Sequence, residues 1–334
     1  MQKLDFLKNT ENRFEKLNSE LVTALDRIND SLMWGAMKYY KDNGYTWIEV
    51  PTLTKVTGAC ENVNTLYPVN HFGKEAYLAQ TGQLYLETKI PKHKKIWTTI
   101  LSSRAEEKVD SRHLNQFSLI EFEHQGDFST LLPVIEGTIH SMIKNAISER
   151  KADFELLGRD VADLEKYLAP FKRISYTDAI KSLQENDFQI YWGDDLNHAS
   201  EMKLIELNNN LPLFVTHFPE KIKFFNMRQN REDSKVVNSA DLLMPYSGES
   251  AGSAEREDNY DILVNRLKNS NMFRVLSERG VTIDAFKEYL DLIKNNPILH
   301  SGAGIGFNRV TQSILKLQDI RQTNNYPINA ETLY

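Results

Sequence analysis

The longest amphipathic pattern lies near the amino end of the chain. Between residues 10 and 42, apolar side chains recur every three or four positions among charged residues, which predicts a helix with one buried face that ends at Gly44. Residues 131–149 repeat this pattern and predict a second helix of the same kind. Further helices are predicted from the same periodicity, two or three between 149 and 210 and one each at 257–268, at 282–294 and from about Arg309.

Runs of β-branched and aromatic residues predict the strands. Residues 45–54 form one such run, and Pro51 within it indicates a sheet edge or a bend, because proline cannot donate to a strand ladder. Helices and strands are interleaved without regular alternation, so we predict an α+β fold, a mainly antiparallel sheet with helices around it. The other predicted strands are 76–79, 96–101, 117–123, 212–216, 239–244 and about 303–307, with a helix between the first two.

Composition narrows the class of protein only slightly. With 41% hydrophobic and 26% charged residues over 334 positions, the chain has the composition of a soluble globular protein. The single cysteine, Cys60, excludes a disulfide framework and every multi-cysteine zinc site. A net charge of −6 argues against a protein that holds nucleic acid by bulk charge. No apolar run is long enough to span a membrane and no targeting segment is visible, so we predict a cytoplasmic protein without membrane contact.

The segment 103–123 carries the densest chemistry. It is predicted as a strand end, a polar loop and a returning strand, which together bring cations, an aromatic ring and carboxylates into one hairpin. Guanidinium groups can grip phosphate oxygens, an aromatic ring can cover a base and carboxylates can hold magnesium. The residues concerned are Arg104, Lys108, Arg112, His113, Phe117, Glu121 and Glu123.

Alternating glycines in residues 299–309 lead directly into Arg309 at the start of a predicted helix. Glycines let a strand approach a ligand closely, and an arginine at a helix start can reach over a bound nucleotide. Spaced glycines alone are a weak signal. Together with the charged hairpin they predict a nucleotide site.

These segments resemble the three signature motifs of class II aminoacyl-tRNA synthetases. Residues 45–51 resemble motif one, the hairpin resembles motif two, and residues 304–309 resemble motif three. Within that class the chain is similar to the aspartyl, asparaginyl and lysyl subclass, and most of all to the asparaginyl enzymes. The resemblance spans about residues 20 to 325 and implies the class II catalytic fold, with residues 1–334 as a single catalytic domain. Supporting segments are 57–61, 81–87, 192–196, 218–219, 241–249, 252–256 and 300–302.

The same resemblance implies an ATP site with magnesium. It places Arg104 on the α-phosphate and makes Arg104 and Arg309 the catalytic residues, with Phe117 and Arg309 enclosing the adenine. It gives the metal to Asp241 and Glu249. The remaining ATP-binding residues that it implies are Glu106 near the adenine or the amine of the amino acid, Arg112 and His113 at the γ-phosphate, and Glu249.

An amino acid pocket is also implied. Aspartyl enzymes carry a lysine three residues after the glutamine that corresponds to Gln83, whereas this chain has Leu86 there, followed by Glu87 as in asparaginyl enzymes. An aspartate side chain needs a cation and an amide needs a donor and an acceptor. We therefore predict asparagine or a close analogue in the pocket, with aspartate second. The amino acid-binding residues that the resemblance implies are Glu61, Gln83, Glu87, Arg256 and His300.

The chain also departs from the family pattern. Asn308 replaces the acid before the motif-three arginine, and Asn226 replaces a tyrosine. Near the carboxyl end, Gln322 stands where the family has an aspartate and Ile328 where it has an arginine. The first forty residues offer no room for the five-stranded OB barrel with which family members read an anticodon. The substitutions lie around the substrate and acceptor ends of the site, so they bear most on the identity of the acceptor.

The function predicted from these features is that of an ATP-dependent, AMP-forming ligase. It would activate aspartate, asparagine or an analogue as an adenylate and pass it to a non-tRNA acceptor, foremost ammonia, as in the asparagine synthetases related to this family, or another small amine. One alternative is a truncated asparaginyl-tRNA synthetase that uses tRNA. Another is a non-catalytic sensor, which would not need phosphate arginines and metal carboxylates together. The proline of motif one, Pro51, implies a homodimer.

Overall fold

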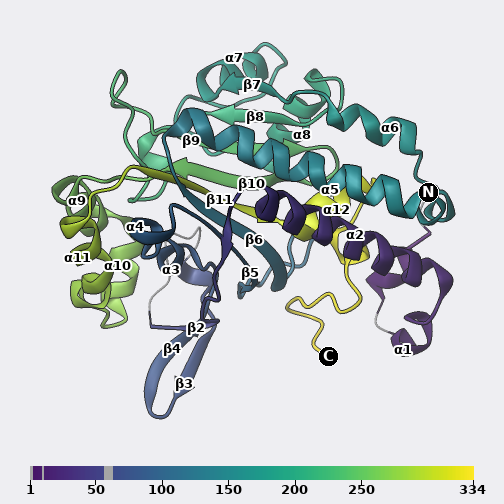
Figure 1. The fold of residues 1–334 in the computed structure, drawn as a ribbon, viewed down its shortest axis with the longest axis horizontal. Coiled ribbons are helices and arrows are strands. Elements are labelled where there is room, and N and C mark those ends of the chain that lie inside the picture. Colours follow the sequence, from purple (N-terminus) through teal and green to yellow (C-terminus); the bar gives the residue numbers. More distant parts are fainter. Residues whose placement is uncertain (1–2, 10, 56–62) are drawn as a thin grey trace.

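The computed structural model describes residues 3–9, 11–55 and 63–334. An eight-stranded sheet runs through its centre (Figure 1). The inner neighbours pair antiparallel, whereas β1 with β5 and β7 with β8 at the two edges pair parallel. In spatial order the strands are β1 (Thr46–Trp47), β5 (Lys95–Ser103), β6 (Gln116–Gln125), β11 (His300–Gly306), β10 (Gly248–Glu255), β9 (Ser239–Met244), β8 (Leu213–Thr216) and β7 (Lys172–Ser175).

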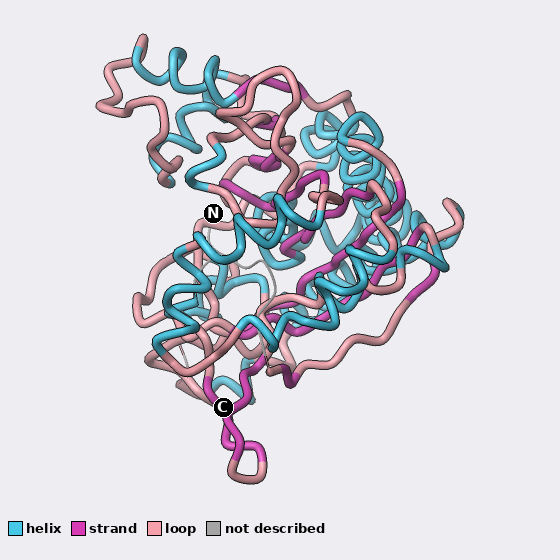
Figure 2. The backbone as a smooth tube through the Cα atoms, turned by 90° about the vertical axis from the view of Figure 1, so that its left-hand side faces the viewer, coloured by secondary structure: helices cyan, strands magenta, loops and turns pink. Residues whose placement is uncertain are grey.

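The predicted strand at 45–54 is interrupted around Pro51, where the sequence predicts a bend or a sheet edge. It forms β1 and then β2 (Leu53–Thr54), with Pro51 in the irregular stretch between them, because proline has no N–H for a ladder. β2 pairs with β4 (Lys74–Leu78), which pairs with β3 (Pro68–His71) in a separate three-stranded sheet. The β3–β4 hairpin extends away from the rest of the chain in both views (Figures 1 and 2).

Two long helices, α2 (Glu20–Asp42) and α5 (Phe128–Leu157), pack together across one face of the sheet. The side chain of Ser19 accepts the Val22 N–H at the start of α2, and Asp127 does the same for Ser129 at the start of α5. The predicted single helix from residue 10 is therefore divided: α1 (Arg13–Lys16) stops before the Ser19 cap.

Shorter helices cover the remaining surfaces. α7 (Tyr176–Gln184) and α8 (His198–Leu207) share a core with β8 and β9. α9 (Tyr260–Asn269), α10 (Asn271–Glu278) and α11 (Lys287–Asn295) share another core with α3 (Gln83–Glu87). The remaining α-helices of the described residues are α4 (Ile90–His93), α6 (Val161–Glu165) and α12 (Phe307–Ile314).

Within the described ranges, no helix has both the length and the apolar character that crossing a membrane requires. The sheet, its antiparallel centre and the helices around it agree with the α+β fold predicted from the sequence. Strands β3, β7 and β10 were not among the predicted elements. β10 consists of glycine, serine, alanine and glutamate, without the β-branched and aromatic side chains that favour strands.

Candidate active site

The sheet face opposite α2 and α5 forms the floor of a cavity of about 380 Å³. Side chains alternate between the two faces of a strand, and β6 shows this directly. Ile120 and Phe122 pack into the core with α2 and α5, whereas Leu119, Glu121 and Glu123 line the cavity. The same strand therefore holds the core on one face and the candidate site on the other.

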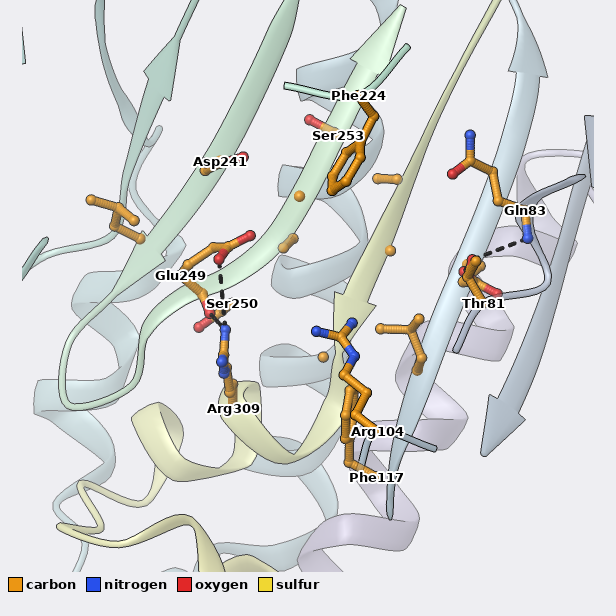
Figure 3. A pocket seen from close by; sticks show the side chains of 18 of the residues that line it. Thr81, Gln83, Arg104, Phe117, Phe224, Asp241, Glu249, Ser250, Ser253 and Arg309 are labelled. Carbon is orange, nitrogen blue, oxygen red and sulfur yellow. Dashed lines mark hydrogen bonds and ion pairs between the residues drawn. The ribbon is translucent and has the colours of Figure 1, made fainter. Parts of the chain in front are cut away.

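Arginines and an aromatic ring gather toward one end of the cavity. The guanidinium carbon of Arg104 lies 5.0 Å from the centre of the Phe117 ring. Nη1 of Arg309 donates to the backbone oxygen of Glu249 at 2.6 Å and lies 3.8 Å from its Oε2. Figure 3 shows Arg104, Phe117 and Arg309 near one another. Arg104 comes from the loop between β5 and β6, Phe117 from β6 and Arg309 from α12. This end offers two cations and one apolar ring face to a ligand.

Arg112 and His113 also lie on the loop between β5 and β6. Nη2 of Arg112 donates to Oε2 of Glu201 on α8 at 2.7 Å. Nδ1 of His113 lies 2.9 Å from Oδ1 of Asp110, so this imidazole is oriented by a carboxylate. Arg112 and His113 line the cavity together with Glu106.

Two carboxylates converge on β10. A Cβ atom at Gly252 would lie 3.2 Å from Oε1 of Glu249 and 3.8 Å from Oδ1 of Asp241. Both carboxylates therefore lie near the backbone of Gly252, which has no side chain. Oδ2 of Asp241 also accepts from Nζ of Lys223 at 2.7 Å. Burial raises the pKa of Asp241, and the Lys223 ammonium offsets part of that rise.

The pair Asp241 and Glu249 fits magnesium in one respect. Among the described residues, no group of three or more His, Cys, Asp or Glu side chains could hold a metal by itself. Magnesium is commonly held by one or two carboxylates together with phosphate oxygens of a substrate. The donor set is therefore suited to a metal that arrives with a nucleotide.

At the other end, Glu87 on α3 is fully enclosed by donors. Its Oε1 accepts from Gln83 Nε2 at 2.6 Å and from Asn226 Nδ2 at 3.2 Å. Its Oε2 accepts from the Tyr289 hydroxyl at 2.9 Å and lies 3.2 Å from His300 Nε2. Although burial opposes charge on both groups, their contact lowers the pKa of Glu87 and raises that of His300, which makes them an ion pair.

Arg256 and Glu123 form a second buried pair that does line the cavity. Nη2 of Arg256 donates to Oε1 of Glu123 at 2.6 Å, and its Nε lies 3.9 Å from Oε1 of Glu87. Gly302 on β11 permits this approach, because a Cβ atom there would lie 2.1 Å from the carboxyl carbon of Glu123. The pair presents a donor and an acceptor side by side.

Glu121 supports the segment before α3. Its oxygens accept from the Thr81 hydroxyl and from the Gly82 backbone N–H, the latter at 2.7 Å. Burial raises the pKa of Glu121 to about 7. Glu121 and Glu123 are both engaged by protein donors, which leaves Asp241 and Glu249 as the carboxylates proposed for magnesium.

The structure brings most of the predicted site residues to one cavity. Glu87 and His300 are exceptions, because they lie behind the cavity lining and contact it through Gln83 and Arg256. Glu61 and Cys60 lie outside the described residues. The predicted residues that line the cavity are Gln83, Arg104, Glu106, Arg112, His113, Phe117, Asp241, Glu249, Arg256 and Arg309.

Lys223 and Glu201 are two of the lining residues that the sequence does not predict. Each is a single charged residue in a segment with other charges, so the local sequence does not distinguish it from a solvated surface residue. The apolar neighbours Ile222 and Phe224 around Lys223 are the one local signal of its burial.

The departures from the family pattern take structural roles. Asn308 accepts from the Ser118 backbone N–H at 3.2 Å and donates to Thr323 Oγ1 at 3.0 Å. Asn226 is fully buried, and its Oδ1 has no hydrogen-bond partner within the described part of the chain. An amide thus takes the place of the family's tyrosine directly behind Glu87.

The fold and site together define an aminoacyl-tRNA synthetase core, and the chain belongs to the family of tRNA synthetases class II (D, K and N), which matches residues 7–330. Among individual relatives it is similar to the asparagine–tRNA ligase of Pyrococcus abyssi, with 36% identity over 95% of this chain and 71% of the relative. The corresponding ligase of Thermococcus gammatolerans is 35% identical over 95% of this chain and 72% of its own length.

Solved structures give the same result. Asparaginyl-tRNA synthetase from Pyrococcus horikoshii, complexed with asparaginyl-adenylate, has a TM-score of 0.90 at 33% identity, over 98% of this chain and 73% of that one. Aspartyl-tRNA synthetase from Entamoeba histolytica has a TM-score of 0.79 at 22% identity, which shows a common fold alone. The class II fold and the resemblance to asparaginyl enzymes predicted from the sequence are thus confirmed.

Proposed function

We propose that this protein activates asparagine with ATP, forming asparaginyl adenylate and pyrophosphate, and transfers the asparaginyl group to tRNA. One observation carries the choice of amino acid: the Arg256–Glu123 pair lines the cavity with a donor beside an acceptor. An amide side chain needs both, whereas the carboxylate of aspartate would meet the negative charge of Glu123. Leu86 on α3 supports this choice, since it supplies no cation.

The acceptor is proposed from the relatives. The matched proteins are asparagine–tRNA ligases, which supports the tRNA alternative of the sequence analysis and gives no support to ammonia. We therefore put tRNA in place of ammonia or another small amine as the proposed acceptor. Ammonia stays in the experiment below as a separate arm.

In the proposed reaction a carboxylate oxygen of asparagine attacks the α-phosphorus of ATP. The new bond joins that oxygen to phosphorus, and the bond to the bridging oxygen breaks, so that pyrophosphate leaves with the electron pair. Arg104 would neutralise charge on the α-phosphate, and Arg112 and His113 would hold the γ-phosphate. Phe117 and Arg309 would enclose the adenine. The chain then acts by position and charge rather than by covalent catalysis.

Magnesium would be held by Asp241 and Glu249 with phosphate oxygens, and it would neutralise charge on the leaving pyrophosphate. Lys223 lies beside Asp241 and fixes the orientation of that carboxylate. Gln83 is positioned by Glu87 and would meet the substrate at the opposite end of the cavity.

Pyrophosphate exchange tests the activation step. Purified protein is incubated with ATP, magnesium and either asparagine or aspartate, and exchange with asparagine well above exchange with aspartate is expected. Faster exchange with aspartate, or none with either amino acid, would contradict the proposal. AMP release is then followed with ammonium and, separately, with total tRNA. Release that depends on ammonium alone would restore the acceptor predicted from the sequence.

A homodimer is also proposed, with the motif-one segment at its interface. Trp34 on α2 and Trp47 on β1 are 56% and 52% exposed, which supports a partner for this region. Gel filtration at working concentration should give a dimer. A monomer would contradict the interface role of Pro51.

A further inference from the structure

One buried carboxylate, at the end of the cavity where the nucleotide would bind, has no role in the proposed reaction. Glu201 on α8 is only 5% exposed and lines the cavity. Its Oε2 accepts from Nη2 of Arg112 at 2.7 Å and from the backbone N–H of Glu249 at 3.3 Å. A negative charge next to a triphosphate would weaken its binding unless the charge serves another group.

Three separate segments are built to bring this carboxylate to Arg112. Gly248, at the start of β10, has a φ of +71°, and a Cβ atom there would lie 2.2 Å from Oε2 of Glu201 and 3.0 Å from Nη2 of Arg112. Only glycine adopts this backbone and leaves this space without strain. The β9–β10 turn, α8 and the loop between β5 and β6 therefore meet at one ion pair.

An imidazole nitrogen also lies near the carboxylate of Glu201. Nδ1 of His198, on the same helix, lies 3.9 Å from its Oε2. Hydrogen bonds between a guanidinium and a carboxylate are shorter and stronger than those between neutral groups.

The hydrogen bond to Glu201 uses one nitrogen of the planar guanidinium of Arg112. Nη2 of Arg112 is held by Glu201, while its Nε is buried and has no hydrogen-bond partner among residues 3–9, 11–55 and 63–334. Because the guanidinium is rigid and planar, anchoring one nitrogen fixes the direction of the others.

We propose that Glu201 is a positioning residue for ATP, which fixes the guanidinium of Arg112 through Nη2 so that its remaining donors meet the terminal phosphate oxygens. The inference rests on the proposed function in taking Arg112 as a phosphate ligand. Glu201 itself does not touch the nucleotide, and its whole effect passes through Arg112.

Direct binding of ATP tests this without the full reaction. Isothermal titration with ATP and magnesium, in the absence of amino acid, should give about tenfold weaker binding for Glu201→Ala. Glu201→Gln keeps an oxygen acceptor and should stay within about threefold of the parent. Glu206→Ala, on the exposed part of the same helix, is the matched control and should bind as the parent does. Should Glu201→Ala not fold, Glu201→Asp replaces it and should bind ATP less well than Glu201→Gln.

A double-mutant cycle with Arg112→Ala separates positioning from general damage. If Glu201 acts through Arg112, adding Glu201→Ala to Arg112→Ala causes no further loss of ATP affinity. Equal losses in both backgrounds, or ATP binding by Glu201→Ala as tight as the parent's, would overturn the inference.

The two proposals fail in different ways. If the parent protein shows no pyrophosphate exchange but ATP binding follows the cycle, the proposed function falls and the inference about Glu201 stands. If exchange with asparagine is normal and the cycle is additive, the inference falls and the function stands.

Discussion

The hydroxyl of Tyr289 on α11 donates to Oε2 of Glu87 on α3 at 2.9 Å and joins two helices that are 202 residues apart in the chain. Three more side chains, those of Gln83, Asn226 and His300, contact the same carboxylate. A carboxylate accepts about four hydrogen bonds, so Glu87 has no acceptor site left for a ligand. Its contribution to amino acid binding is therefore expected to be indirect.

Replacement of Tyr289 by phenylalanine tests that indirect role. The variant leaves one buried lone pair of Glu87 unsatisfied, which should cost about 1–3 kcal/mol of unfolding free energy. We expect the KM for asparagine in pyrophosphate exchange to rise by a few-fold, with the KM for ATP unchanged, because only the amino acid end is disturbed. Tyr260→Phe, on α9 and outside the cavity lining, is the control. An equal rise in both KM values would contradict this assignment.

Arg104 is the second test. Arg104→Ala removes the cation over the Phe117 ring and the charge proposed to act on the α-phosphate. Exchange should fall by at least about a hundredfold while the melting temperature stays near that of the parent. Lys108→Ala, an exposed cation on the same loop, should keep its activity. Retained exchange in Arg104→Ala would show that the motif-two assignment is wrong.

The specificity pair gives a third prediction. Glu123→Gln removes a negative charge from the wall of the amino acid pocket and leaves Arg256 facing a neutral group. The preference for asparagine over aspartate in kcat/KM should fall by about tenfold or more. The measurement compares exchange rates with the two amino acids at several concentrations. An unchanged ratio would remove Glu123 from the recognition of the side chain.

Two glycines on β11 provide a matched pair for the fourth prediction. A methyl group at Gly302 would lie 2.1 Å from the carboxyl carbon of Glu123, whereas at Gly304 it would meet Leu119 at an ordinary 3.5 Å. Gly302→Ala should therefore displace the Arg256–Glu123 pair and abolish asparagine-dependent exchange. Gly304→Ala should leave that pair in place, so the exchange that it retains should keep the parent's preference for asparagine over aspartate. Asparagine-dependent exchange by Gly302→Ala at the parent's level would contradict the close approach at Gly302.

Glu121 makes stability depend on pH. Because burial raises its pKa from 4.5 to about 7, the folded state holds this proton more tightly than the unfolded state does. Its contribution to stability is fully present below about pH 4.5 and is lost as the pH rises to about 7, by about 3 kcal/mol in all. Glu121→Gln cannot ionise, so relative to the parent it should gain stability between pH 5 and pH 8 in urea unfolding. Parallel pH curves for the two proteins would show that the pKa of Glu121 is not raised.

Much of the fold is readable from local patterns. The apolar faces of α2 and α5, the β-branched and aromatic run of β5 and the apolar residues of β6 and β9 place their elements within a few residues. The ends of the helices depend on single residues whose effect the hydrophobic pattern does not show. Ser19, which caps α2 and separates it from α1, is one example. β10 was missed because small residues form a strand here only through pairing with β9 and β11.

The site residues, like the fold, could be predicted only in part. Motif residues such as Arg104, Phe117 and Arg309 were predicted because they recur in family order, and the cavity contains them. Glu87 and His300 were predicted as amino acid-binding residues, but their place behind the cavity lining and the contact of Glu87 with Tyr289 were not, because these residues meet only after distant helices pack together. Which predicted acid faces the ligand and which faces protein donors is decided by tertiary contacts.

The alternation along β6 has a consequence for how this protein can change over time. Shifting the strand by one residue would exchange Phe122 with a carboxylate and place charge against α2 and α5. An insertion or deletion in β6 would therefore remove core and cavity together, and selection can act on it only by substitution. The projecting β3–β4 hairpin does not line both the core and the cavity, so variation in its length can accumulate.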